Sequence, residues 1–450
     1  MAALEEAAAG GRTGLLRVLG VVFGVAVTVG GVIGMGILRT PGEVARQLPS
    51  ESLFVGAWAL GGLYALLGTL SVAELGTAWP RSGGFYVFVR RALGEYPAFV
   101  VGWSDWLSTC GTIAAVALVA GEYAGKLAVA FKGKETAVAA SVVLFFALLQ
   151  WRGVRWGSRS QELTSLIKTL AFLALTWACF AYGGGAAGAP PRFYVTEENT
   201  TVLLLLASLL RAMQGIIYTY DGWYNAIYFG EEVREPERNV PRAMIGSVLL
   251  VIVIYLLFNV ALLRVLGIEG MAGESLAAGA AAGRVFGERG GAIIGWVALV
   301  SLLAAVNAFT LIAPRIIYAM SRDRLVWRGA SRVNRGGTPT SALAMSTAAA
   351  VLMIVFSRAF EQLLAALAFF FVTNYAAAFL SVFVLRRREP DAPRPYRAWG
   401  YPWTTGLVLA ASVAFLAGAV AADTANSLYA LGLLALSLPA YLVAGRARTT

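Results

Sequence analysis

The residues best suited to bind a ligand begin with a glycine-rich stretch, VTVGGVIGMGILRTPG, at residues 27–42. Gly30, Gly31, Gly34 and Gly36 crowd into it, and each glycine costs a helix interior about 1 kcal/mol relative to alanine. The stretch therefore predicts a broken helix, whose free N–H groups and positive dipole end can hold an anion such as a carboxylate. The alternative is close helix packing, since Gly30 and Gly34 also form a GxxxG pair.

A second interrupted stretch is MQGIIYTYDGWYNAIYFGEEV at residues 213–233, where Gly215, Asp221 and Gly222 fall in an apolar run. A carboxylate in such a run is costly unless it has a partner or faces water. Two broken helices that meet suit a zwitterion, because freed carbonyls accept hydrogen bonds from an ammonium group while free N–H groups hold the carboxylate. The two stretches together favour a site for an amino acid.

An isolated cation lies in a third apolar run. Lys168 is about ten residues into residues 163–182, roughly 15 Å along a helix, whereas the other lysines cluster at residues 126–134. A lysine that snorkels to the membrane surface is the alternative, but a side chain at this depth reaches the interface with difficulty. We therefore expect a fixed ammonium group inside the molecule.

Composition disfavours other kinds of chemistry. The chain has no histidine, which removes histidine-based triads, metal sites and proton relays. Cys110 and Cys179 both lie in apolar stretches and predict neither a disulfide framework nor a zinc site. We expect no metal, no cofactor and no enzyme activity. The net charge of +11 comes from basic clusters between apolar runs, which is typical of membrane loops rather than of a nucleic-acid-binding surface.

Membrane helices must position these residues. Hydrophobic residues make up 58% of the 450-residue chain and charged residues 14%, against about 45–50% and about 25% in soluble domains. A helix needs about 20 apolar residues to cross a bilayer. Charges divide the chain into twelve candidate helices, at residues 18–38, 52–73, 96–121, 136–151, 163–182, 200–230, 243–263, 290–314, 336–357, 362–385, 398–422 and 424–445.

Both ends of the chain are predicted to be cytoplasmic. Lysine and arginine are concentrated in the loops that would share a side with the N-terminus, and an even number of spans returns the C-terminus there. The opening MAALEEAAAGG has no basic cluster, so the first helix is not a cleavable signal. We expect Glu74, Glu231 and Glu232, near cytoplasmic helix ends, to pair with arginines. The protein is thus predicted to be a multi-pass protein of the cell membrane, embedded in the lipid bilayer.

Five motifs in order carry a resemblance to a known family. They are VIGMGILRTPGEVA at 32–45, AELGTAWPRSGGFYVFVRRALGEYPAFVVGWSDW at 73–106, YDGW with EEVREPERNVPRA at 220–243, APRIIYAMSRDRL at 313–325 and RPYRAWGYPW at 394–403. The chain resembles an amino acid permease of the amino acid–polyamine–organocation superfamily, close to the L-type amino acid transporters. The resemblance covers nearly the whole chain.

The resemblance implies an all-α integral membrane protein with twelve transmembrane helices. Its fold is a LeuT-like five-plus-five inverted repeat with broken first and sixth helices, followed by two extra C-terminal helices. The implied boundaries are a cytoplasmic tail at 1–14, a first repeat at 15–182, a second repeat at 200–386, helices eleven and twelve at 398–445, and a cytoplasmic C-terminus at 446–450.

The resemblance also implies the substrate-binding residues. In the family, N–H groups of the first break hold the substrate carboxylate, carbonyls of the inner half-helix hold the ammonium group, and an aromatic residue of the sixth helix closes over the substrate. Many relatives have serine where this chain has Met35, so the hydroxyl contact is lost and the backbone contact is kept. Asp221 either holds the amine or narrows the pocket. The implied positions are Val32, Gly34, Met35, Gly36, Tyr218, Thr219 and Asp221.

Three further residues take roles from the same resemblance. The lysine matching Lys168 occupies the place of sodium in sodium-coupled relatives, where it ties the fifth helix to carbonyls of the broken first helix. This implies transport without sodium. Asn307 and Asn374 lie in helices eight and ten, where each either lines the cavity or forms hydrogen bonds between helices.

These features predict a sodium-independent exchanger of neutral L-amino acids that works by alternating access. One alternative is a proton-coupled symporter, motivated by Asp221, and another is a carrier of cationic amino acids or polyamines. A channel is disfavoured because the sequence has no repeated filter motif. A receptor-like sensor with the same fold is a further alternative that the sequence does not exclude. The resemblance implies a small-molecule amino acid as partner. In eukaryotic L-type relatives a cysteine between helices three and four joins a glycoprotein subunit; because the loop around residues 124–134 has no cysteine here, we expect no disulfide-linked heavy subunit.

Overall fold

The computed structural model describes residues 14–48, 50–183, 202–356, 367–422 and 424–446. Its described secondary structure is almost entirely helical. The α-helices are α2 (Val21–Val32), α3 (Met35–Gln47), α4 (Glu51–Ala78), α5 (Phe85–Leu93), α6 (Glu95–Leu127), α7 (Glu135–Trp151), α8 (Val154–Ala181), α9 (Val202–Thr219), α10 (Pro236–Met271), α11 (Ala277–Phe286), α12 (Gly290–Arg322), α13 (Thr340–Val355), α15 (Leu367–Arg388), α16 (Trp403–Ala422), α17 (Thr424–Ala435) and α18 (Ser437–Arg446).

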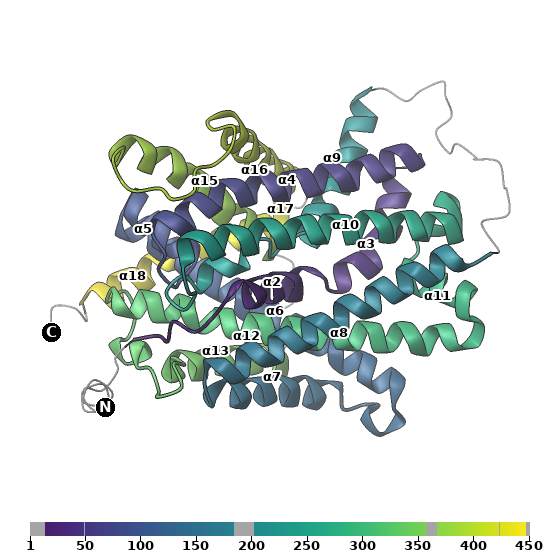
Figure 1. Cartoon of the computed structure of the whole chain (residues 1–450), viewed down its shortest axis with the longest axis horizontal. Helices are drawn as coiled ribbons and strands as arrows, with labels where there is room; N and C mark the ends of the chain where they lie inside the picture. The colour runs from purple at the N-terminus through teal and green to yellow at the C-terminus, as the bar shows by residue number, and fades with distance from the viewer. Residues whose placement is uncertain (1–13, 49, 184–201, 357–366, 423, 447–450) are drawn as a thin grey trace.

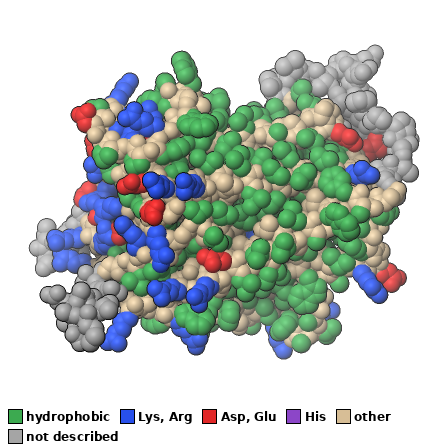
Figure 2. Space-filling view, in the orientation of Figure 1, with side chains coloured by type: hydrophobic (Ala, Val, Ile, Leu, Met, Phe, Trp, Pro, Cys, Tyr) green, Lys and Arg blue, Asp and Glu red, His purple; other side chains and the backbone are tan. Residues whose placement is uncertain are grey.

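Many of these helices can cross a membrane. Seven described helical stretches are long and apolar enough to do so, and the bent pair α2–α3 makes an eighth. The 28 residues of α4, for example, extend about 42 Å, more than the hydrocarbon thickness of about 30 Å. Figure 2 shows hydrophobic side chains over the middle of the molecule, with basic side chains gathered at the end that holds α5 and α18 in Figure 1. The predicted continuous helix at 424–445 is instead divided into α17 and α18.

Helix α2 lies near the centre of the molecule (Figure 1), packed against α8, α10 and α12. Its glycines and small residues permit close contact with these neighbours. Since α3 continues from α2 after a short interruption, the break in this pair falls within the bundle. Helices α6 and α12, which pack against each other, contribute side chains to the cavity at the break.

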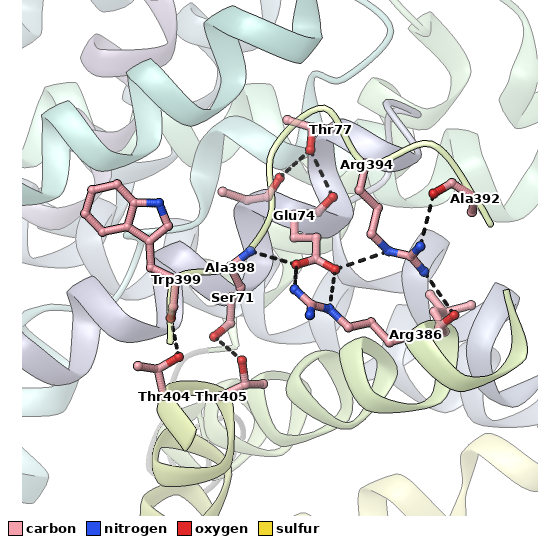
Figure 3. A network of polar contacts seen from close by, with 12 residues as sticks. Ser71, Glu74, Thr77, Arg386, Ala392, Arg394, Ala398, Trp399, Thr404 and Thr405 are labelled. Carbon is pink, nitrogen blue, oxygen red and sulfur yellow. Dashed lines mark hydrogen bonds and ion pairs between the residues drawn. The ribbon is translucent and has the colours of Figure 1, made fainter. Parts of the chain in front are cut away.

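A buried ion-pair cluster fastens α4 to α15 and to the loop before α16 (Figure 3). The Glu74 carboxylate accepts hydrogen bonds from Arg386 Nε at 2.9 Å and from the Ala398 N–H at 2.7 Å, and Arg394 Nε lies 3.3 Å from Glu74 Oε1. The expected pairing of Glu74 with arginines is confirmed, and the partners come from the far end of the sequence. Burial of Tyr396 in this loop, together with the smaller effect of the nearby negative charge of Glu74, raises the pKa of its phenol to about 12. The phenol therefore stays neutral.

Candidate functional site

The break predicted from the glycine-rich stretch is present between α2 and α3. Helix α2 ends at Val32 and α3 begins at Met35, with a 45° bend between them. Gly34 is extended (φ −139°, ψ −148°), which interrupts the helical hydrogen bonding. The C-terminal carbonyls of α2 and the first N–H groups of α3 therefore lie at the same depth in the bundle.

Close packing accounts for two of the glycines before the break. A Cβ atom on Gly30 would lie 1.9 Å from Gln161 Nε2, and a Cβ atom on Gly31 would lie 2.2 Å from Asn225 Nδ2. Asn225 Nδ2 also donates a hydrogen bond to the Val27 carbonyl at 3.3 Å. The two interpretations of the stretch thus apply to different glycines: packing explains Gly30 and Gly31, and the break follows them.

The second break follows α9. This helix ends at Thr219, residues 220–224 form turns, and a 3₁₀-helix, η2, covers Asn225–Tyr228. Gly222 has φ +101°, a conformation that favours glycine. The expectation that Gly215 belongs to the interruption is wrong, because Gly215 lies inside α9 and a single glycine does not end a helix held by its neighbours.

A cavity of about 120 Å³ lies where the two breaks meet. All seven residues proposed from sequence for substrate binding line it. Tyr218 is half exposed there, whereas the neighbouring Thr219 is buried. The lining residues that were not proposed for substrate binding from the sequence come from α2, α6, α12 and α15: Gly31, Thr112, Val116, Leu302, Ala305, Phe309 and Phe371. The cavity is therefore lined by backbone of the two breaks and by largely apolar side chains of α6, α12 and α15.

Lys168 contacts the first break from α8. Its side chain is fully buried, and Nζ donates hydrogen bonds to the Gly30 carbonyl at 2.7 Å and to the Ile33 carbonyl. Both carbonyls lack helical partners because the helix stops there. The ammonium group therefore compensates the negative end of α2 and does not reach the interface.

Tyr255, on α10, joins the two breaks and was missed by sequence reasoning. Its hydroxyl lies 2.9 Å from the Val32 carbonyl and 3.1 Å from the Thr219 carbonyl, the ends of α2 and α9. The ring is buried against Trp58 and Tyr220, at centroid distances of 5.9 Å and 4.9 Å. The available signal was a phenol inside the charge-free run at 243–263, since a buried hydroxyl needs a partner.

Asp221 lines the cavity just after α9. Its Oδ1 accepts hydrogen bonds from the Tyr224 hydroxyl at 3.2 Å and from the Tyr375 hydroxyl of α15. Among the ion pairs of the described residues, none includes Asp221, and the Lys168 ammonium group is directed at the first break instead. The carboxylate is thus held by two tyrosine hydroxyl groups and by the Gly222 N–H.

Asn307 and Asn374 form hydrogen bonds between helices, and neither is among the residues that line the cavity. Asn307 Nδ2 donates to Gln161 Oε1 of α8 at 2.8 Å, and Asn307 Oδ1 accepts from Gln150 Nε2 of α7 at 3.0 Å. Asn374 Oδ1 accepts from the Ser104 hydroxyl at 3.0 Å. Of the two roles considered, cavity lining and hydrogen bonding between helices, both asparagines have the second.

The chain is tied together beyond the second break by a buried salt bridge. Arg315 of α12 and Glu232 form two parallel hydrogen bonds of 2.9 and 2.8 Å, and both side chains are almost fully buried. The Leu19 N–H, just before α2, donates to the Glu232 carbonyl at 2.9 Å, while Glu231 pairs with Arg322. The expected pairing of Glu231 and Glu232 with arginines is confirmed, and it joins α12 to the segments flanking both breaks.

The cavity offers groups for a small zwitterion. Within the described ranges, no group of three or more acidic or cysteine side chains is placed to hold a metal ion. The N-terminus of α3 presents N–H groups, α2 and α9 end in carbonyls, and an apolar wall faces both. These features suit a molecule with an anionic group, a cationic group and a compact apolar body.

Comparisons with known proteins agree with this chemistry. The amino acid permease family model matches residues 17–437. The chain is 30% identical over 417 residues to the serine/threonine exchanger SteT of Bacillus subtilis (strain 168), covering 91% of this chain and 93% of that protein. It is 28% identical to b(0,+)-type amino acid transporter 1 of Mus musculus, covering 86% of this chain and 79% of that protein. It is also 28% identical to large neutral amino acids transporter small subunit 2 of Oryctolagus cuniculus, covering 87% and 74%.

Proposed function

Because this chain belongs to the amino acid permease family, we propose that it is a secondary active transporter that exchanges neutral L-amino acids across the cell membrane without sodium. The relatives named above are transporters and an exchanger rather than enzymes. The single observation that carries the proposal is the cavity between two broken helices, because it places free N–H groups and helix-end carbonyls around one small volume.

The substrate pose follows from the helix ends. The substrate carboxylate binds the N–H groups of Gly34, Met35 and Gly36 at the positive end of α3. The ammonium group lies at the C-terminal ends of α2 and α9, near Val32 and Thr219, whose carbonyls can each accept a second hydrogen bond. The substrate side chain then faces the apolar wall, and Tyr218 covers the opening.

Independence from sodium follows from how the break carbonyls are satisfied. Lys168 Nζ donates to the Gly30 and Ile33 carbonyls, and the Tyr255 hydroxyl lies within hydrogen-bonding distance of the Val32 carbonyl. A sodium ion would need oxygen ligands of this kind. Because a fixed ammonium group already supplies the positive charge at this break, no ion is required to hold it together.

Alternating access requires that one end of the cavity be closed at a time. The Glu232–Arg315 pair and the Leu19 contact close the chain beyond the second break, where the adjacent Glu231 pairs with Arg322 at the basic end of α12. We propose that this side is cytoplasmic, that both termini lie there, and that the closure opens to release substrate. When the closure opens, both charged side chains regain their hydration. Breaking this pair therefore costs less free energy than separating well-packed apolar side chains of similar volume.

The membrane topology that fits this mechanism has twelve helices in a LeuT-like inverted repeat, with repeats at 15–182 and 200–386 and two further helices at 398–445. The bent pair α2–α3 is then the first helix, and α9 with η2 the sixth. The eight candidate spans and three shorter apolar helices of the described residues, together with α9, make twelve and support this topology. We propose that no disulfide-linked subunit is needed, since Cys110 and Cys179 are both buried thiols.

A second candidate function is proton-coupled symport, or transport of cationic amino acids or polyamines. The observation in its favour is Asp221, a carboxylate that lines the cavity and has hydroxyl partners. A carboxylate in that place can take up a proton or attract a cationic substrate.

Transport into liposomes distinguishes the candidates. Purified protein is reconstituted without sodium, half of the vesicles are preloaded with unlabelled amino acids, and uptake of a labelled neutral mixture is measured. Exchange predicts uptake only into the preloaded vesicles. Equal uptake into empty vesicles rejects obligatory exchange, and uptake that collapses with the proton gradient supports the symporter.

A further inference from the structure

The charge inside the cavity is unbalanced. Among the described residues that line it, Asp221 alone has a side chain that can carry a formal charge, and the rest are glycine, hydroxyl, thioether, aromatic and aliphatic residues. The fixed cation of this region, Lys168, is not among the lining residues and is bound to two carbonyls of the first break. A ligand in the cavity therefore meets one carboxylate and no cationic side chain.

The structure also fixes where that carboxylate is. Tyr224 and Tyr375 both donate to Asp221 Oδ1, one from the turn after α9 and the other from α15. Both tyrosines are nearly fully buried, and their rings pack at a centroid distance of 5.3 Å. Two buried donors on a single oxygen hold the carboxylate at the cavity and leave it available to act on a ligand through space.

We propose that Asp221 makes this cavity select its substrate by charge, so that amino acids with a carboxylate side chain are rejected while neutral amino acids of the same shape are accepted. The inference rests on the proposed function and names the substrate class of that site. It assigns Asp221 a role in selection that does not require direct contact with the substrate amine. No cationic side chain is among the described lining residues, which include Phe309 and Phe371, so an acidic substrate side chain finds no compensating cation there.

The expected discrimination is large. Two like charges about 5 Å apart, at an effective dielectric constant of about 20, repel strongly enough to reduce affinity on the order of 100-fold. A hydrogen-bonded carboxylate partly screened by water would still discriminate about tenfold. Size cannot produce this difference between glutamate and glutamine, or between aspartate and asparagine, because the members of each pair have nearly the same shape.

The test is competition by these matched pairs in the exchange assay described above. In the wild-type protein, glutamine and asparagine should compete with the labelled neutral mixture at least tenfold better than glutamate and aspartate. Asp221→Asn keeps the shape of the side chain and removes its charge, and it should reduce that ratio at least tenfold. Tyr375→Phe is the matched control, because it removes a donor to the same carboxylate but keeps the charge, and it should preserve the ratio.

Failure of this inference can be separated from failure of the proposed function. Equal competition by glutamate and glutamine in the wild-type protein, with exchange intact, overturns the inference alone. A ratio that falls as much in Tyr375→Phe as in Asp221→Asn also overturns it, because geometry rather than charge would then be responsible. If no amino acid is taken up and none raises the unfolding temperature of the purified protein, the proposed function falls and this inference with it.

Discussion

Removing the Tyr255 hydroxyl should weaken the site without disturbing its packing. Tyr255→Phe keeps the ring that lies against Trp58 and Tyr220, and it deletes the group within hydrogen-bonding distance of the Val32 and Thr219 carbonyls. Those carbonyls end α2 and α9, so neither has a helical partner to replace the hydroxyl. The variant therefore removes the hydroxyl group that bridges the two broken helices, while the packing of the aromatic core stays intact.

The magnitude follows from the hydrogen bonds lost. A buried acceptor left without a donor costs about 1–3 kcal/mol, which corresponds to about 5- to 150-fold in an equilibrium constant. The hydroxyl has one proton for two carbonyls, so one such loss, rather than two, is expected. Because the substrate ammonium group is proposed to bind at these same helix ends, we expect the loss to appear mainly as a higher KM for exchange.

The control is Tyr220→Phe. Tyr220 lies in the turn after α9 and belongs to the same aromatic cluster, but its buried hydroxyl donates to the Trp58 carbonyl at 3.3 Å and not to a carbonyl at the end of α2 or α9. Both variants should lower the unfolding temperature slightly, and only Tyr255→Phe should raise KM. Equal effects of the two variants on KM, or none from Tyr255→Phe, would refute the reasoning that the hydroxyl organises the breaks.

Three further predictions concern the polar groups outside the cavity. Lys168→Ala should reduce the exchange rate at least tenfold, because two carbonyls of the first break lose charge-assisted hydrogen bonds of about 1.5–3 kcal/mol each. Thr169→Ala is the control and should change the rate little, because the Thr169 hydroxyl donates within its own helix. Equal exchange rates of the two variants would contradict the role of Lys168. Glu74→Gln should lower the free energy of unfolding by about 3–5 kcal/mol, whereas Glu389→Gln, in a surface pair, should lower it by under about 1 kcal/mol in chemical denaturation. Asn307→Ala should lower the free energy of unfolding by about 1–3 kcal/mol and leave unchanged the ratio in which glutamine and glutamate compete for exchange. An altered ratio would show that Asn307 affects the cavity.

The breaks were predictable because their causes are local. Glycine has low helix propensity and an aspartate in an apolar run needs a reason, so both signals can be read within about 20 residues. The predicted depth of Lys168 also follows from counting residues along one helix. The presence of a break can thus be predicted from the sequence, whereas the angle between the two half-helices, 45° here, cannot.

The apolar wall was not predictable because its residues come from separate helices. Val116, Leu302 and Phe371 lie in long, mainly apolar runs on α6, α12 and α15, where hydrophobic residues occur on all sides and do not mark one face. Which face turns toward the cavity depends on how these helices pack against each other. The same reason left Asn307 between two interpretations, since a polar residue in an apolar helix shows that it has a partner but not which one.

A comparison of the intramembrane polar groups locates the site independently of any single residue. An unsatisfied polar group at membrane depth is expensive, so groups with no role toward a ligand should find partners within the protein. Asn307, Glu232 and Glu74 do so with other side chains, and Lys168 does so with carbonyls at the first break. Among the described residues, the groups left facing the cavity include the N-terminus of α3, the Thr112 hydroxyl and the Asp221 carboxylate. A zwitterion supplies a carboxylate for the first and an ammonium group compatible with the last, so substrate binding completes an arrangement of hydrogen bonds that the helices leave open.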